Sequence, residues 1–571
     1  MKHKSQHKSH SVPGRGKAEL PVEKKDRSFL ERTDSTVFYL AFISLFVFFI
    51  RIKFLHIPFE RDEGVYSYMG QLILDGKTPY IDFYELKPPG LYYLYAAFIY
   101  VFGNTIEDLH FGFIFVNIGT IIFICLAGKA LLGKTAGIIA AAAYALLSLA
   151  PHISGFTVQS EHLIAFFVSG GIFLFLHGIE KNKASYFFGS GLMLGMSALV
   201  KQNGLFFIAF AGVMIVCHYV LTRPADRKAL FRNTGLYAAG VATMLLLCFA
   251  VMLLHGAWDQ FIFWTYDYAR SYSSAIPLAD GLKLFFSTLG RVMDNYTLFW
   301  LLALVGLLLA VFADTGLGIF KKIFFSLFTL LSFVAIAPGL RFYGHYWIFL
   351  MPCIALLAGL FFYTARALLR KNFSAQVSGG IAAGIFLLAV ISNIARKQDY
   401  YFSPNPKKIL REVYGMNPFP EAKVVGDYIK QRTTAQDKIA VLGSEAEVYF
   451  YADRRCPSRH CDAAGLLNAH PVSSGFQREF IRDVEAAKPK YFVLFNNPIS
   501  LMVFPGADTT LFGWFNTYVP RNYRLVGIAD MISPQETRYV WEEEALTYRR
   551  QSNYFIGVFQ RREEIQNLPA R

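Results

Sequence analysis

The sequence predicts a polytopic α-helical membrane protein with a small α/β domain at its C-terminal end. Apolar runs of about 17–25 residues, the length that crosses a bilayer as helix, recur from residue 36 to residue 395. The chain is 54% hydrophobic and only 17% charged, against roughly 25% charged in soluble domains. Beyond residue 395 the sequence becomes polar and alternates helical and strand patterns.

Residues 1–35 form a basic, His-rich tail that we expect to be disordered and cytoplasmic. No cleavable signal peptide is apparent, because no small-residue cleavage site follows the first apolar run. The net charge of +15 would suggest nucleic acid in a soluble protein. Here the basic residues lie mostly between apolar runs, so they indicate orientation in the bilayer, and no nucleic-acid partner is expected.

About eleven segments are predicted to cross the membrane. They are residues 36–55, 109–131, 135–152, 161–180, 185–200, 203–222, 235–254, 296–313, 323–338, 346–366 and 378–395. A further apolar piece, Leu91 to Phe102, is short for a crossing. If it does not cross, the short basic connections from Lys134 onward fall on the side of the basic tail, as the positive-inside rule requires. We therefore expect an interfacial or re-entrant helix there.

The number of membrane crossings before each loop predicts which polar connections lie on the outer face of the membrane. They are the loop that contains Asp62, Gln159–Glu161, Lys201–Asn203, the loop around 256–295, and Arg341–Tyr346. The polar C-terminal region, residues 396–571, falls on the same side. Three parts are therefore predicted: the tail 1–35, a membrane domain 36–395 with its first outer loop at 56–108, and an extracytoplasmic α/β domain 396–571.

The C-terminal region contains four apolar runs typical of short strands, separated by amphipathic segments. The strands are expected at Ile439–Leu442, Tyr491–Phe495, Leu525–Ile528 and Phe555–Phe559, and helices at Glu421–Arg432 and Gln477–Ala487. Cys456 and Cys461 in this region are candidates for a local disulfide in an oxidising compartment. A zinc site with the nearby histidines is not favoured, because the spacing fits no familiar pattern.

Two adjacent acids, Asp62 and Glu63, follow the first apolar run. Neighbouring side chains on a helix point in different directions, so we expect one acid to act in chemistry and the other to orient it. A partly desolvated carboxylate at the membrane edge would have a raised pKa, which suits a general base. The alternative is that both acids simply end a helix at the water interface.

Further polar residues stand where the apolar runs meet. Pro88 and Pro89 would fix Lys87 in a rigid frame, where it can bind a phosphate or merely extend toward the headgroups. Glu161 begins a span, where the helix dipole alone would stabilise it. Lys201 and Gln202 interrupt a nearly continuous apolar stretch and are functional candidates on that ground.

The segment Arg341–Trp347 connects two late apolar runs and reads RFYGHYW. Its arginine, histidine and tyrosines would grip a lipid phosphate. The alternative is an aromatic belt at the membrane interface with an extended arginine. The residues themselves leave both interpretations open.

In their order along the chain, these motifs resemble those of the GT-C membrane glycosyltransferases. The pattern is Asp-Glu after the first span, a Lys-Pro-Pro, an acid between later spans, a Lys-Gln at a membrane edge and an Arg-x-Tyr-x-His-Tyr connection. The branch it resembles contains bacterial relatives of protein O-mannosyltransferases (glycosyltransferase family 39) and of lipid A aminoarabinose transferase. The resemblance covers about residues 36–395; each motif alone is weak, and their joint order is more specific.

The resemblance implies a GT-C fold in a multi-pass protein of the bacterial inner membrane. It implies an inverting transferase that moves a hexosyl or pentosyl group from a polyprenyl-phosphate carrier to an acceptor outside the cytoplasm. The acceptor would be a hydroxyl or phosphate of a glycan, lipid or protein, as in protein glycosylation or lipopolysaccharide modification.

The resemblance also implies roles for individual residues. Asp62 would be the general base, with Glu63 beside it. Tyr66, Glu85 and Glu161 would bind the sugar or acceptor, although Glu85 stands one residue further from the lysine than in some relatives. The lipid phosphate would be bound by Lys87, Lys201, Gln202, Arg341, His345 and Tyr346.

No metal ligand is predicted. Relatives with an Asp-x-Asp motif bind a divalent metal, whereas this loop reads Asp-Glu-Gly, so a metal cofactor remains open but is not favoured. The competing function is a transporter or flippase of a lipid-linked or small polar substrate. Transporters usually place ionisable groups near the bilayer midplane and carry repeated halves. This chain gathers its charges at one edge without an evident repeat, which favours the enzyme over the transporter. A third interpretation is a catalytically silent relative that only binds lipid or anchors partners, and the presence of Asp62 argues against it.

Overall fold

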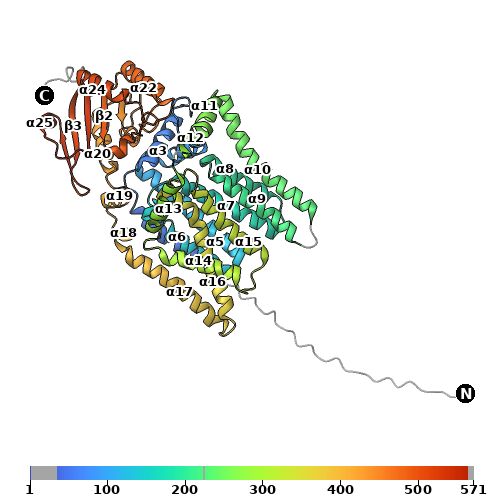
Figure 1. Ribbon diagram of the computed structural model, residues 1–571. Helices are drawn as coiled ribbons and strands as arrows, with labels where there is room; N and C mark the ends of the chain where they lie inside the picture. The colour runs from blue at the N-terminus through green and yellow to red at the C-terminus, as the bar shows by residue number, and fades with distance from the viewer. Residues whose placement is uncertain (2–34, 223–225, 275, 563–571) are drawn as a thin grey trace.

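The computed structural model describes residues 1, 35–222, 226–274 and 276–562. The predicted cytoplasmic tail therefore lies outside the described residues, apart from its two ends. The described chain forms a bundle of long helices, with a smaller domain containing a sheet at one end of it (Figure 1). This confirms the predicted fold class.

Each of the eleven predicted spans coincides with a helix. The helices are α2 (Ser35–Ile52), α5 (Ile106–Leu132), α6 (Lys134–Leu147), α7 (Ser160–Lys181), α8 (Ser185–Val200), α9 (Gly204–Leu221), α10 (Arg227–Leu254), α14 (Thr297–Phe312), α15 (Ile319–Ile336), α16 (Met351–Leu369, preceded by the 3-10 segment η3, Gly344–Leu350) and α17 (Ala375–Arg396). In the described part of the chain, eight are long and apolar enough to cross a membrane. The other three, α6, α8 and α14, are apolar but have only 14–16 residues.

The first outer loop contains two helices, α3 (Arg61–Leu74) and α4 (Gly90–Phe102). With 13 residues, α4 is about 20 Å long, which is short for a membrane crossing. The two helices pack closely, since a Cβ added at Gly70 of α3 would lie 3.0 Å from the backbone of α4. The first residue of α4, Gly90, packs equally closely against Leu199 at the end of α8.

The loop around 256–295 is helical throughout most of its length. It contains α11 (Trp258–Ile262), a π-helical segment η2 (Phe263–Tyr268), α12 (Ala269–Ser273) and α13 (Leu278–Met293). α13 meets α14 at a bend of 108°. A ninth spanning element results if these two helices are counted as one bent span.

The C-terminal domain is built on a five-stranded sheet in the order β1-β2-β5-β3-β4. The strands are β1 (Ile439–Leu442), β2 (Tyr491–Asn496), β3 (Tyr523–Met531), β4 (Thr537–Trp541) and β5 (Phe555–Arg561). Only β1 and β2 pair in parallel. The four predicted strands are confirmed, and the edge strand β4 is the one that the sequence pattern did not reveal.

Short helices surround this sheet and connect it to the membrane helices. They are α18 (Gln398–Phe402), α19 (Pro406–Tyr414), α20 (Phe419–Lys430), α21 (Glu447–Ala452), α22 (Ser473–Ala487), α23 (Pro498–Leu501), α24 (Thr510–Asn522) and α25 (Glu543–Thr547). The predicted helices correspond to α20 and α22. The change of composition at residue 396 coincides with the end of α17.

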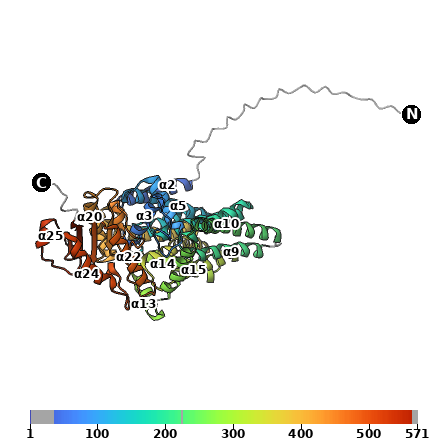
Figure 2. The same cartoon turned by 90° about the horizontal axis from the view of Figure 1, so that it is seen from above.

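The C-terminal domain rests directly on helix α3 of the first outer loop (Figures 1 and 2). The ring of Tyr68 stacks on Tyr449 of α21 with centroids 5.0 Å apart. The hydroxyl of Tyr451 accepts a hydrogen bond from the backbone N–H of Phe59, 2.8 Å long. A single buried apolar cluster includes side chains of both parts. Helix α3 therefore packs against both the membrane helices and the C-terminal domain.

Candidate functional site

Helix α3 brings the two adjacent acids to the centre of the molecule. The helix starts at Arg61 because the side chain of Glu60 caps it, accepting a hydrogen bond of 2.8 Å from the backbone N–H of Glu63. It ends at Leu74, shortly before Gly76, whose φ of +79° suits glycine. Asp62 and Glu63 therefore occupy the first turn, where the helix dipole stabilises negative charge.

Asp62 faces an ammonium and an imidazole from distant parts of the chain. Its Oδ2 lies 4.0 Å from Nζ of Lys87 and 3.9 Å from Nε2 of His345. Lys87 follows in the first outer loop, whereas His345 belongs to η3 between two late helices. The Asp62 side chain remains 32% exposed, so a substrate can reach it.

Lys87 is held in place through both its backbone and its side chain. Its Nζ lies 3.2 Å from Oε1 of Glu85, and its backbone N–H donates a hydrogen bond of 2.9 Å to Oε2 of the same acid. Its carbonyl accepts hydrogen bonds from the hydroxyls of Tyr80 (2.7 Å) and Tyr92 (3.0 Å). Its ammonium lies 4.8 Å from the ring centroid of Tyr66. The lysine is thus positioned before any substrate arrives.

Glu161 and Lys201 form a buried ion pair beside this group. The ammonium of Lys201 donates a hydrogen bond to the carboxylate of Glu161, which also accepts one of 3.0 Å from the hydroxyl of Ser160. The same ammonium lies 3.9 Å from the ring centroid of Tyr346. The pair joins the start of α7 to the α8–α9 connection and brings Tyr346 of η3 against both.

Arg341 offers a cation without a carboxylate partner among the described residues. Its guanidinium stacks on the ring of Tyr272 at 3.9 Å and donates to the Tyr343 hydroxyl at 3.4 Å. Its Nε is buried and unpaired. Tyr272 was not singled out by the sequence, because a tyrosine in a polar loop carries no distinctive signal there. No ion pair joins Arg341 to Asp62, so the arginine lies beside the central group.

Gln202 contacts the backbone of two neighbouring segments. Its side-chain amide donates to the backbone carbonyls of Leu86, at 2.8 Å, and Thr265, at 3.3 Å. These bonds tie the Lys-Pro-Pro loop to η2. The amide therefore holds the loop in place, and its two donor bonds go to the backbone.

Glu63 is directed away from Asp62 and lies outside the group. Its Oε1 is 2.8 Å from Nε2 of His110 and accepts a hydrogen bond of 3.0 Å from the backbone N–H of Val158. The side chain is fully buried. It connects α3 to α5 and to the segment before α7, as an acid with a supporting role would.

The charge around Asp62 also corrects the expected pKa shift. Burial raises the pKa of Asp62, but the neighbouring side chains of Lys87, His345 and Lys201 outweigh it and lower the pKa to about 2. The expectation of a raised pKa considered only desolvation. For Lys87, burial lowers the pKa, but the neighbouring carboxylates of Glu85 and Asp62 outweigh it and raise the pKa above its usual value. Both groups are therefore charged near neutral pH.

Metal ligands and disulfides do not contribute to the described site. In residues 35–222, 226–274 and 276–562, no group of three or more His, Cys, Asp or Glu side chains is placed to hold a metal ion. Cys456 and Cys461 carry free thiols. Nδ1 of His460 lies 2.5 Å from the Tyr84 hydroxyl, and its Nε2 lies 3.2 Å from Glu479.

Comparison with known proteins agrees with this architecture. Residues 86–255 match the family model of dolichyl-phosphate-mannose-protein mannosyltransferases, while no curated protein matches the sequence. The apo oligosaccharyltransferase of Archaeoglobus fulgidus is 14% identical with a TM-score of 0.55, covering 89% of this chain and 74% of that one. ArnT from Cupriavidus metallidurans, also apo, is 14% identical with a TM-score of 0.54, covering 92% and 97%.

A third structure is AglB from Archaeoglobus fulgidus, in complex with an inhibitory peptide and a dolichol-phosphate. It is 13% identical to this chain with a TM-score of 0.52, and the alignment covers 90% of this chain and 75% of that one. Identities this low establish the fold and leave the substrates open. Together with the family match, they show that the chain has the GT-C fold of membrane glycosyltransferases.

Proposed function

We propose that this protein is an inverting glycosyltransferase. It moves a hexosyl or pentosyl group from a polyprenyl-phosphate carrier to an acceptor on the outer face of the bacterial cytoplasmic membrane. The observation that carries the proposal is the position of Asp62, a partly exposed carboxylate within 4.0 Å of Lys87 and His345. A base that faces phosphate-binding cations is the arrangement that glycosyl transfer from a phosphate carrier needs.

The reaction assigns one role to each side of this arrangement. Asp62 accepts the proton of the acceptor hydroxyl as its oxygen attacks the anomeric carbon, on the face opposite the phosphate. The bond between that carbon and the phosphate oxygen breaks, and its electron pair leaves with the phosphate. Lys87, Lys201 and His345 stabilise the charge that develops there, and Arg341 extends the cationic surface.

The remaining predicted residues support these groups. Glu85 and Glu161 hold Lys87 and Lys201 in place through their ion pairs, and we assign them sugar and acceptor contacts as well. Tyr66 and Tyr346 place aromatic rings beside the same two ammonium groups. Gln202 and Glu63 position the loop and helix rather than the substrate.

Donor binding would activate the base. In the free protein the neighbouring basic side chains, Lys87 foremost, keep the pKa of Asp62 near 2, which makes it a weak base. A bound carrier phosphate would neutralise part of that positive charge, so the pKa of Asp62 would rise once the donor is in place. The base would then become effective mainly in the productive complex.

The membrane orientation follows from the basic connections. They lie at the opposite ends of the helices from the Asp62 group, and by the positive-inside rule this supports the proposal that the group and the C-terminal domain lie outside the cytoplasm. The three-part division at residues 35 and 395 belongs to the same proposal.

The test is carrier release by the purified full chain in detergent, supplied with several polyprenyl-phosphate sugars. At least one should release carrier phosphate when a suitable acceptor is present. Asp62→Asn should lower that rate by about 10²–10⁴-fold, the usual contribution of a general base. Asp280→Asn, an exposed acid on α13 that pairs with Lys283, is the matched control and should leave the rate unchanged.

Unchanged turnover in Asp62→Asn would remove the proposed base. We further propose that the reaction needs no divalent metal, because the loop carries Asp-Glu-Gly in place of Asp-x-Asp. Activity that disappears in chelator and returns with added metal would contradict this second point alone.

A further inference from the structure

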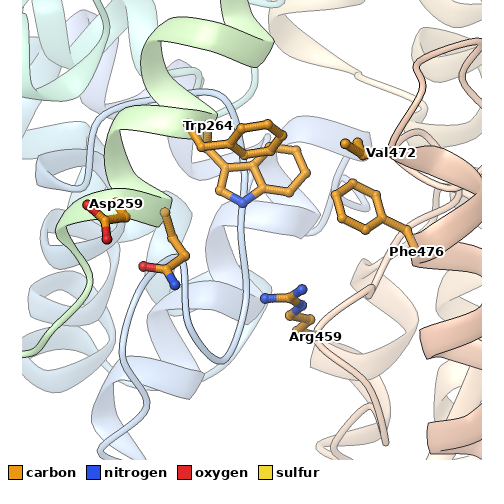
Figure 3. A pocket seen from close by; sticks show the side chains of 7 residues that line it. Asp259, Trp264, Arg459, Val472 and Phe476 are labelled. Atoms are coloured by element: carbon orange, nitrogen blue, oxygen red, sulfur yellow. The ribbon is translucent and has the colours of Figure 1, made fainter.

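A pocket lies between the η2 segment of the membrane domain and helix α22 of the C-terminal domain. Its volume is about 330 Å³. In Figure 3, Trp264, Phe476 and Arg459 point toward the same space, and Asp259 lies across from them. Ligand pockets usually occupy 300–1,000 Å³, so this one suits a small group such as one or two sugar rings.

The wall of the pocket is aromatic and firmly supported. Trp264 stacks on Tyr84 with ring centroids 3.9 Å apart and planes 5° apart, and Phe476 lies 5.4 Å from Trp264 on centroids. Phe476 remains partly exposed. Trp264 belongs to the π-helical η2, a conformation that occurs frequently at functional sites.

The rim of the pocket supplies polar groups that other residues do not occupy. Asp259 and Gln260 are exposed, and their side chains have no hydrogen-bond partner among the described residues. Arg459 donates one hydrogen bond of 2.9 Å to Glu479, but its Nε is buried without a partner. A carboxylate and an amide are therefore available beside an aromatic wall, and the guanidinium of Arg459 lies at the same rim.

The pocket is connected to the Asp62 group through the Lys-Pro-Pro loop. Tyr84, whose ring supports Trp264, directly precedes Glu85, which pairs with Lys87. The Tyr84 hydroxyl in turn contacts His460 of the C-terminal domain at 2.5 Å. A ligand in the pocket would thus contact Trp264, which packs directly on the loop that carries Lys87.

From this combination we propose that the pocket binds a sugar ring of the acceptor. The proposal rests on the transferase function proposed above and specifies the acceptor as a carbohydrate or the carbohydrate part of a larger molecule. A sugar presents a C–H face that packs on aromatic rings and hydroxyls that pair with carboxylate, amide and guanidinium groups. An acyl chain would leave those polar groups unpaired, and Asp259 disfavours an isolated phosphate beside Arg459.

The test measures saccharide binding to the full chain in detergent without any donor. The probes are the methyl glycosides of glucose, galactose, mannose and N-acetylglucosamine, followed by saturation-transfer NMR. At least one should bind with a Kd of about 1 mM. The double variant Asp259→Asn/Gln260→Ala changes only exposed side chains and should weaken that binding at least tenfold. Asp267→Asn, an exposed acid of η2 outside the pocket, should bind as the unaltered chain does.

Two results would overturn the proposal: no glycoside binds, or the double variant binds as tightly as the unaltered chain. In the second case the sugar occupies another place, such as the Asp62 group. Because the assay contains no donor, it separates this inference from the proposed function. Saccharide binding without carrier release would contradict only the transferase, and carrier release without binding at the pocket would contradict only the acceptor site.

Discussion

The two sides of helix α3 meet surroundings of opposite charge. On one side, Asp62 faces the ammonium of Lys87 and the imidazole of His345. On the other side, Arg61 faces the C-terminal domain and its buried carboxylate Glu445, 3.3 Å away. Consecutive residues of a helix point about 100° apart, so an acid and a base that are neighbours in sequence can serve two different interfaces.

The contacts on the outer-domain side are the more numerous. Besides Glu445, the guanidinium of Arg61 donates to Asn417 Oδ1 at 3.1 Å and to the carbonyl of Ile499 at 3.0 Å. Glu445 also accepts a hydrogen bond from Ser500. Through these contacts the C-terminal domain helps to determine where Asp62 lies, although none of its described residues belongs to the Asp62 group.

The largest expected effect comes from breaking the outer-domain side at Arg61. Arg61→Met removes the cation and leaves Glu445 buried without its charged partner, which should shift the first turn of α3. A displacement of about 1 Å can cost up to 10²-fold in rate, so we expect kcat to fall about ten- to hundredfold. The donor KM should change little, since the phosphate-binding residues lie on other elements. Steady-state kinetics of carrier release separates the two parameters.

A second ion pair provides the control for Arg61. Arg455 of the C-terminal domain pairs with Asp75 at the far end of α3 and also contacts Gln71. The Arg455 side chain is 29% exposed and the Asp75 side chain 41%, and such pairs contribute about 0–1 kcal/mol. Arg455→Met should therefore leave kcat within about twofold. Equal losses in the two variants would mean that general destabilisation, and not the position of Asp62, lowers the rate.

An intermediate effect is expected where α3 touches α21. A Cβ added at Gly64 would lie 2.5 Å from Cβ of Glu447 and 2.8 Å from its Oε2. Gly64→Ala must push the two helices apart, and overpacking of this kind costs about 1–3 kcal/mol. The thermal unfolding midpoint in detergent should fall accordingly, together with transfer activity.

The matched glycine is Gly290 of α13, which has no atom within 4 Å of an added Cβ. Gly290→Ala should raise stability by about 0.5–1 kcal/mol, because alanine is the better helix former. If Gly64→Ala proved equally harmless, the close contact between α3 and α21 would not exist in solution.

The sequence revealed the parts of the fold that depend on local patterns. The apolar runs predicted all eleven long helices, because the length and composition of a run are local properties. The edge strand β4 was not predicted, because its residues TRYVW mix polar and apolar side chains on a half-exposed strand. Whether such a segment forms a strand is decided by its partner β3, and pairing is not a local property.

The candidate site shows the same limit. The motifs and the number of predicted membrane crossings placed four residues on one face of the membrane. They are Asp62, Lys87, Lys201 and His345, and the structure brings them together. The sequence predicted that Asp62 and Glu63 point in different directions, but not the partners of Glu63, because these depend on how α3 is rotated against α5. The pKa of Asp62 was expected to shift upward because desolvation is visible in the sequence, whereas the number of cations that surround one carboxylate is not.

The smallest expected effect concerns Glu60, whose side chain caps the first turn of α3. Burial, followed by the nearby charge of Asp62, raises the pKa of Glu60 from 4.5 to about 8. The folded protein therefore retains a proton that the unfolded chain loses, and this contribution to stability declines as the pH rises from about 4.5 to about 8.

Glu60→Gln keeps an acceptor for the N–H of Glu63 but cannot ionise. It should match the unaltered chain at pH 5 and unfold at a higher temperature than the unaltered chain at pH 8. Glu536→Gln, an exposed acid of the C-terminal domain, should show no such divergence. If the unfolding temperatures of Glu60→Gln and Glu536→Gln changed in parallel from pH 5 to pH 8, Glu60 would already be ionised in the folded protein. The first turn of α3 would then be more hydrated than its burial implies.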